Sequence, residues 1–268
     1  MEISVISDLM YNMKSKIKIF ETNKLDGKMS KNPRFYPKNT SIEERYQKFY
    51  QDRLNLGKKL GINGNHILRI RQKGLSNINY EDGKYVLIDE KHMTKEDYFL
   101  EDIQGDIIII SEKHKEVAIV NPQADCPILI CEDRNKGYTA LSHCGAPYIN
   151  RKLPQDTIKA LIKCCNSNIE DIYVHIGSCI KKESYIYDKY PKWATNKEVW
   201  EGFIVEKDNN YYIDLPGAII KQLQEIGIKN IEESPIDTAK DPNYYSHVEE
   251  VKGTQQEGGQ NLVGFYYK

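Results

Sequence analysis

Two residues with reactive side chains, Cys126 and His143, each stand at the end of a strand-like run. The first apolar run covers residues 117–131 and the second covers residues 138–147. Between them, Glu132–Gly137 is polar and rich in turn formers, which predicts a hairpin-like connection. If the two strands pair, the thiol and the imidazole come within reach of each other. Such a pair can bind a metal ion or activate a thiolate nucleophile.

The elements that would position this pair can be predicted from patterning. Ser41 and Glu44 form a capping box at the start of a helix, and Gly61 is a suitable C-cap for it. We expect further strands at residues 17–21, 66–71, 85–89, 106–111, 172–176, 211–215, 231–234 and 262–267, and further helices at 154–165, 189–203 and 216–226. Because these elements do not follow a regular βαβ rhythm, the sequence favours an α+β fold with mixed sheets.

Composition excludes several classes of protein. A chain of 268 residues with 40% hydrophobic residues can bury one substantial core. The net charge of -1 gives no electrostatic reason to expect nucleic acid or a membrane surface as a partner. No run approaches the roughly 20 apolar residues of a membrane span. Six irregularly spaced cysteines without a C-x-x-C motif favour a reduced, cytoplasmic protein over a disulfide framework.

The order of short motifs over residues 41–268 resembles the laccase-domain family, also called the multicopper polyphenol oxidase, purine nucleoside phosphorylase or DUF152 family. The motifs are Arg71-Gln72 for the family's Gln-x-His-Gly turn, Ala124-Asp125-Cys126-Pro127 for its Ala-Asp-Cys, Ser142-His143-Cys144-Gly145 for its His-Ala-Gly, Ile176-Gly177-Ser178-Cys179-Ile180 for its Ile-Gly-Pro-x-Ile, Tyr185 for a later Tyr, and Asp241–Ser246 for a Phe-Phe-Ser stretch.

This resemblance implies a layered α/β/β/α sandwich, similar to the cysteine-hydrolase fold. Residues 41–268 would form the catalytic core, and residues 1–40 would add a strand and an irregular segment to the same domain. The resemblance also implies site roles. Cys126, His143 and Asp125 would be catalytic, and Gln72, Gly145, Gly177, Cys179 and His247 would contact the substrate.

The resemblance implies a zinc site as well, held in the family by the histidine of Gln-x-His-Gly, the cysteine of Ala-Asp-Cys and the histidine of His-Ala-Gly. Here Cys126 and His143 are present, but Gln72 is followed by Lys73-Gly74, so the third ligand is missing. Two ligands make a weak site, and Cys144, His175 or Cys179 are candidate replacements. We expect no copper cluster in a chain with six histidines.

Three functions remain open. A nucleoside-directed enzyme, of the purine nucleoside phosphorylase or adenosine deaminase type, comes first. A metal-free thiol amidohydrolase, deamidase or acyl-transfer enzyme comes second, because the cytotoxic necrotizing factors and the chemotaxis receptor deamidase are similar in fold and use a Cys–His pair. A pseudoenzyme that acts as a binding module is third, since the arginine of the family's His-Ala-Gly-Trp-Arg-Gly is also lost. The expected partner is a small molecule, either a nucleoside or an amide, and the sequence leaves the oligomeric state open.

Overall fold

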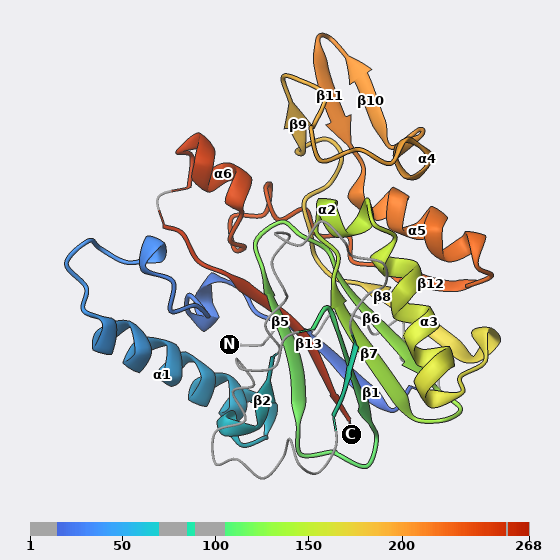
Figure 1. Ribbon diagram of the computed structural model, residues 1–268. Helices are drawn as coiled ribbons and strands as arrows, with labels where there is room; N and C mark the ends of the chain where they lie inside the picture. The colour runs from blue at the N-terminus through green and yellow to red at the C-terminus, as the bar shows by residue number, and fades with distance from the viewer. Residues whose placement is uncertain (1–14, 70–84, 89–104, 256, 268) are drawn as a thin grey trace.

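The computed structural model describes residues 15–69, 85–88, 105–255 and 257–267. Its main body has four layers: a helix, a four-stranded sheet, a six-stranded sheet and a second helical layer (Figure 1). Three clusters of buried side chains fill the three spaces between neighbouring layers. This arrangement confirms the predicted α+β class and the α/β/β/α order.

The four-stranded sheet joins the two ends of the described chain. Its order is β1 (Ile17–Glu21), β13 (Asn261–Tyr267), β5 (Ala118–Gln123) and β2 (Ile67–Leu68). Strands β1 and β13 are antiparallel, with Ile17 opposite Tyr267. The N-terminal and C-terminal strands therefore lie side by side in one sheet.

Helix α1 (Ile42–Leu60) covers the outer face of this sheet. It begins where the sequence predicts, because the Ser41 side chain accepts a hydrogen bond from the Glu44 amide and the Glu44 side chain accepts one from the Ser41 amide. It ends at Gly61, which adopts the left-handed conformation with φ of 72°. On its buried side, Leu56 packs in one cluster with Ala118 and Val120 of β5.

The six-stranded sheet lies at the centre of the molecule. Its order is β12 (Asn230–Glu233), β8 (Ile172–Ile176), β6 (Ile128–Asp133), β7 (Tyr138–His143), β4 (Ile107–Ser111) and β3 (Tyr85–Leu87). Ile107 and Ile109 of β4 pack toward the second helical layer, whereas Ile108 and Ile110 pack toward the other sheet. A strand buried on both faces needs such a continuous apolar run.

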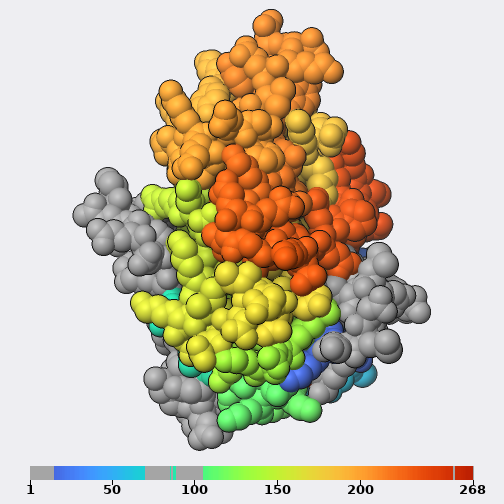
Figure 2. All heavy atoms as spheres, turned by 90° about the vertical axis from the view of Figure 1, so that its right-hand side faces the viewer, coloured from blue at the N-terminus to red at the C-terminus, as the bar shows by residue number. Residues whose placement is uncertain are grey.

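The second helical layer covers the other face of the six-stranded sheet. It consists of α2 (Ala146–Ile149), α3 (Leu153–Cys165) and α5 (Leu215–Glu225). Figure 2 shows this side of the molecule, with a smaller lobe projecting above the helices.

The smaller lobe is a three-stranded antiparallel sheet. Its order is β10 (Ile204–Lys207), β11 (Asn210–Ile213) and β9 (Ile186–Tyr187). The helix predicted over residues 189–203 was wrong, because only α4 (Lys197–Trp200) is helical there. The rings of Trp193 and Trp200 pack edge to face, with centroids 5.0 Å apart. Their apolar pattern reflects this tertiary packing and not a helical face.

The remaining elements are short. Helix α6 (His247–Lys252) precedes β13, and single 3-10 turns are found at Lys24–Asp26, Pro33–Phe35, Gly64–His66 and Ile169–Asp171. Within the described ranges, no helix has the length and apolar character needed to cross a membrane.

Candidate active site

Cys126 lies in the turn by which the chain passes from one sheet to the other. The run 117–131 was predicted as one strand, but it forms two, with β5 in the four-stranded sheet and β6 in the six-stranded sheet. The break occurs at residues 124–127, where Asp125 has a φ of 89°. An extended strand cannot contain this conformation, so the chain turns sharply beside the cysteine.

His143 is the last residue of β7, next to that turn. The predicted hairpin is confirmed, since β6 and β7 pair with Ile128 opposite His143. The Cys144 amide donates to the Pro127 carbonyl at 2.9 Å, which extends the pairing as far as the turn. The main chain therefore fixes how the ends carrying the thiol and the imidazole lie.

The side chains of Cys126 and His143 both lie close to Gly145. A β-carbon on Gly145 would lie 3.2 Å from Cys126 Sγ and 3.8 Å from His143 Nε2. Both reactive atoms thus border the same small space, which is open because residue 145 has no side chain. The structure brings Cys126 and His143 together as the two runs predict, and their chemical roles stay a prediction.

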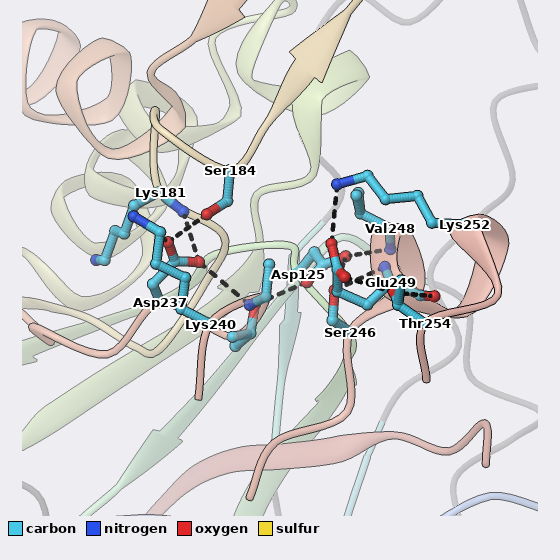
Figure 3. Close-up of polar contacts among 12 residues, drawn as sticks. Asp125, Lys181, Ser184, Asp237, Lys240, Ser246, Val248, Glu249, Lys252 and Thr254 are labelled. Atoms are coloured by element: carbon cyan, nitrogen blue, oxygen red, sulfur yellow. Dashed lines mark hydrogen bonds and ion pairs between the residues drawn. The ribbon is translucent and has the colours of Figure 1, made fainter. Parts of the chain in front are cut away.

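Asp125 connects the cysteine turn to two distant segments (Figure 3). Its carboxylate accepts hydrogen bonds from the Thr238 hydroxyl at 2.7 Å, the Ser246 hydroxyl at 3.1 Å and the Val248 amide at 2.8 Å. Its main-chain oxygen accepts another from the Ile180 amide at 3.0 Å. Burial raises the pKa of Asp125, and the hydrogen bonds that its carboxylate accepts from Thr238, Val248 and Ser246 oppose that rise. Both carboxylate oxygens therefore accept hydrogen bonds from residues 238–248, and these bonds hold the turn in place.

Burial sets the protonation states of the pair. It raises the pKa of the Cys126 thiol to about 12, and the negative charge of Asp125 adds to that rise. It lowers the pKa of His143 to about 4. At neutral pH the pair is therefore a thiol and a neutral imidazole. A neutral imidazole can accept a proton, and a thiolate would need further stabilisation by a substrate or a cation.

Two tyrosines interact electrostatically with Cys126. Burial, mainly, raises the pKa of Tyr148 to about 12, and a charge on Cys126 contributes to the rise. Burial and the Tyr187 hydroxyl raise the pKa of Tyr185, with smaller contributions from Cys126 and Asp125. The Tyr185 hydroxyl lies 3.1 Å from that of Tyr187. Both phenols are neutral at physiological pH and can serve as hydrogen-bond donors.

The other residues predicted to contact substrate lie in different parts of the fold. Gly177 allows a close approach between sheets, because a β-carbon there would lie 2.7 Å from Val263 Cγ1. Cys179 is fully buried, and its main chain pairs with that of Asp237 in an isolated parallel β-bridge. His247 begins α6 and faces Glu250, with Nδ1 3.6 Å from a carboxylate oxygen. Gln72 lies outside the described residues.

The candidate replacement ligands Cys144, His175 and Cys179 are all fully buried. Cys144 is fully buried in the helix-side core, 3.5 Å from the Ser142 hydroxyl. His175 is fully buried inside the six-stranded sheet. In the part of the chain that the structure describes, no group of three His, Cys, Asp or Glu side chains could hold a metal ion. Cys126 and His143 are two such ligands, and a catalytic zinc site uses three protein ligands and an open position.

Sequence reasoning did not assign a role to Thr238, Ser246 or Val248. A partial signal was present, because Ser246 closes the stretch 241–246 that resembles the family's Phe-Phe-Ser. Ser246 is also the N-cap of α6 and accepts a hydrogen bond from the Glu249 amide at 3.2 Å. Its role in holding Asp125 follows only from the folded arrangement.

This chain is similar to several known proteins in sequence or in fold. A purine nucleoside phosphorylase of Rickettsia prowazekii is 27% identical over 136 residues, which cover 49% of this chain and 55% of that protein. The match thus spans only about half the length of that relative. YlmD of Geobacillus stearothermophilus has a TM-score of 0.75 at 18% identity and covers 95% of this chain and 93% of its own.

Two further solved structures share the fold. The hypothetical protein YfiH of Bacillus licheniformis has a TM-score of 0.70 at 15% identity, covering 94% of this chain and 93% of its own. A DUF152 protein of Neisseria meningitidis has a TM-score of 0.67 at 13% identity, covering 95% of each chain. The sequence profile described as multi-copper polyphenol oxidoreductase laccase matches residues 40–260. This match covers most of the chain, which therefore belongs to the multi-copper polyphenol oxidoreductase laccase family.

Proposed function

We propose that this protein is an enzyme that acts on purine nucleosides in a pocket around Cys126 and His143. The observation that carries the proposal is the placement of Cys126 Sγ and His143 Nε2 around one open point beside Gly145. The relative named purine nucleoside phosphorylase supports a nucleoside as the substrate class. We infer that the enzyme works in the cytoplasm on a small-molecule substrate.

His143 is the acid–base group of the proposed reaction. Its pKa of about 4 keeps the imidazole neutral, so it can accept a proton from an attacking oxygen at neutral pH. The Cys126 thiol stays protonated and is a weak hydrogen-bond donor beside it. Asp125 keeps the cysteine turn in place through its bonds to Thr238 and Val248.

Two reactions on a nucleoside differ in the nucleophile. In deamination of adenosine, a water oxygen bonds to C6, the C6–N6 bond breaks and ammonia leaves. In phosphorolysis, a phosphate oxygen bonds to C1′, the C1′–N9 bond breaks and the base leaves with a proton. Pro147 stands where the resemblance implies an arginine facing an anion, and here it lies in the first turn of α2. A proline carries no cation for phosphate, so we place deamination first and phosphorolysis second.

The test is an assay of purified protein with adenosine, with and without inorganic phosphate. Inosine and ammonia as products would support deamination, and adenine with ribose 1-phosphate would support phosphorolysis. Cys126→Ala and His143→Ala should each lose most of the activity. Cys164→Ala, which removes a half-buried thiol at the end of α3, is the matched control and should retain it. Full activity in both site variants would overturn the proposal.

The metal-free thiol hydrolase is the less favoured alternative. It needs a thiolate at neutral pH, whereas burial raises the pKa of Cys126 to about 12. Turnover of activated amides or esters that depends on Cys126, without turnover of adenosine, would favour this alternative. Nucleoside binding without any turnover would favour the binding module.

A further inference from the structure

We propose that a second cavity, separate from the Cys126–His143 pair, binds a phosphorylated small molecule of nucleotide size. This cavity, called here the α1 cavity, has a volume of about 630 Å³. Its lining includes Ile42, Arg45 and Tyr46 from the first turns of α1, and Pro122 from β5. Volumes of roughly 300–1,000 Å³ are typical of small-molecule sites.

The α1 cavity lies on the outer face of the four-stranded sheet. Ala118 and Val120 of β5 pack against α1, and Pro122 continues the same alternation along the strand. Cys126 lies beyond the end of β5, where it borders Gly145 and His143. None of these three residues lines the α1 cavity. The two sites are therefore distinct.

The lining carries positive charge from three separate segments. Lys31 comes from the loop before α1, Arg45 from α1 itself and Arg69 from the residue after β2. Among the described residues that line the cavity there is no aspartate or glutamate. Charges of one sign around a concave, partly apolar surface focus the local potential, which attracts an oppositely charged ligand. The cavity therefore selects an anion.

Arg45 has one donor that no acceptor in the described part of the chain satisfies. One of its terminal nitrogens donates to the Thr40 carbonyl at 3.2 Å, which orients the guanidinium. Its Nε is buried and has no hydrogen-bond partner within the described ranges. A buried donor without a partner costs free energy, and a phosphate oxygen would satisfy it. Arginine forks match phosphate geometry well.

Lys31 is held at the cavity by Tyr46. Its Nζ lies 3.2 Å from the Tyr46 hydroxyl and 4.6 Å from the centroid of the same ring. The ammonium therefore has a defined position before any ligand arrives, which reduces the ordering cost of binding. Lys31 and Arg45 can contact the same anionic group from the loop and the helix.

The size and the apolar part of the lining indicate more than a free anion. Inorganic phosphate would leave most of about 630 Å³ unused. Ile42, Pro33 and Pro122 supply apolar surface beside the cationic residues. A ligand that joins a phosphate to a sugar or a nucleobase can use both kinds of surface, so a nucleoside monophosphate is the chemistry that we infer.

The experiment is isothermal titration of the whole protein with adenosine monophosphate, adenosine and inorganic phosphate. We expect the monophosphate to bind, and inorganic phosphate to compete with it weakly. Arg45→Gln should weaken binding by roughly tenfold or more, which corresponds to the loss of one charge-assisted hydrogen bond. Lys58→Gln is the matched control, because it removes the same charge from the exposed last turn of the same helix. The control should bind as the unchanged protein does.

A second variant, Lys31→Gln, tests the same cavity independently in case Arg45→Gln does not fold. Thermal unfolding of each variant shows whether it is folded. Unchanged affinity for the monophosphate in folded Arg45→Gln and Lys31→Gln would overturn the inference. So would an absence of binding at millimolar concentration. Adenosine binding that equals monophosphate binding and falls in Arg45→Gln would also overturn it, since the phosphate would then contribute nothing. Adenosine binding unaffected by either variant belongs to the Cys126 pocket, so failure of one proposal leaves the other testable.

Discussion

The buried carboxylate of Asp125 accepts a hydrogen bond from the amide of Val248 at 2.8 Å, across 123 positions of the chain. Two hydroxyls, from Thr238 and Ser246, complete its contacts. Asp125 itself has a φ of 89°, which is costly for a residue with a side chain. The position of Cys126 therefore depends on contacts made by residues far away in the sequence.

Asp125→Ala is expected to destabilise the protein strongly. It removes the acceptor for three donors and places alanine, which tolerates a positive φ less well than aspartate, at a φ of 89°. We expect a loss of about 2–4 kcal/mol in the free energy of unfolding, measured by urea denaturation. Asp125→Asn should lose less, because asparagine tolerates this region and keeps one acceptor. Equal stability of the two variants would contradict this account.

Cys126 should react slowly with iodoacetamide at neutral pH. The thiolate is the reacting species, and burial raises the pKa of this thiol to about 12. The rate of alkylation should therefore rise about tenfold per pH unit through pH 8 to 10, as followed by peptide mass spectrometry. A plateau below pH 8 would show that the protein stabilises the thiolate, and it would favour the thiol hydrolase.

The metal content should respond to restoration of the missing ligand. As purified, we expect zinc at clearly less than one equivalent, because Cys126 and His143 are two ligands where three are usual. Inserting a histidine between Lys73 and Gly74 recreates the Gln-x-His-Gly order at a position outside the described residues. Zinc measured by elemental analysis should then approach one equivalent. The same insertion with Cys126→Ser is the control and should stay low.

Stability should depend on pH through Glu21. This side chain is fully buried; one oxygen accepts the Ser178 amide at 2.7 Å, and the other has no hydrogen-bond partner in the described part of the chain. Burial raises the pKa of Glu21 from 4.5 to about 7. A raised folded-state pKa stabilises the protein below about pH 4.5, and that contribution is lost as the pH rises through about 7.

Glu21→Gln removes this dependence while keeping an acceptor for Ser178. Compared with the variant, the unchanged protein should lose up to about 3 kcal/mol of unfolding free energy between pH 4.5 and 8. Urea denaturation of both proteins at several pH values measures the difference. Parallel curves for the two proteins would contradict a raised pKa at this position. Comparing the two proteins cancels the contributions of the buried histidines, which both share.

Local pattern by itself determined several elements. The capping box at Ser41 and Glu44 and the glycine at position 61 set both ends of α1, because caps use residues within one turn. The isoleucines of β4 specified a strand buried on both faces. The polar segment 132–137 specified the hairpin that aligns β6 with β7. From that hairpin, the sequence predicted that Cys126 and His143 would meet.

Only the tertiary structure decided how the site is held and charged. The apolar run 117–131 gives no sign that the chain changes sheets at Cys126, and the aromatic residues of 189–203 pack without forming a long helix. The bonds of Asp125 join segments more than 110 positions apart, and local propensity carries no information about such contacts. The raised pKa of Cys126 and the lowered pKa of His143 arise from burial. Burial is a property of the packed chain. Residue types and spacing could therefore identify Cys126 and His143 as a pair, but they could not predict the protonation state of either side chain.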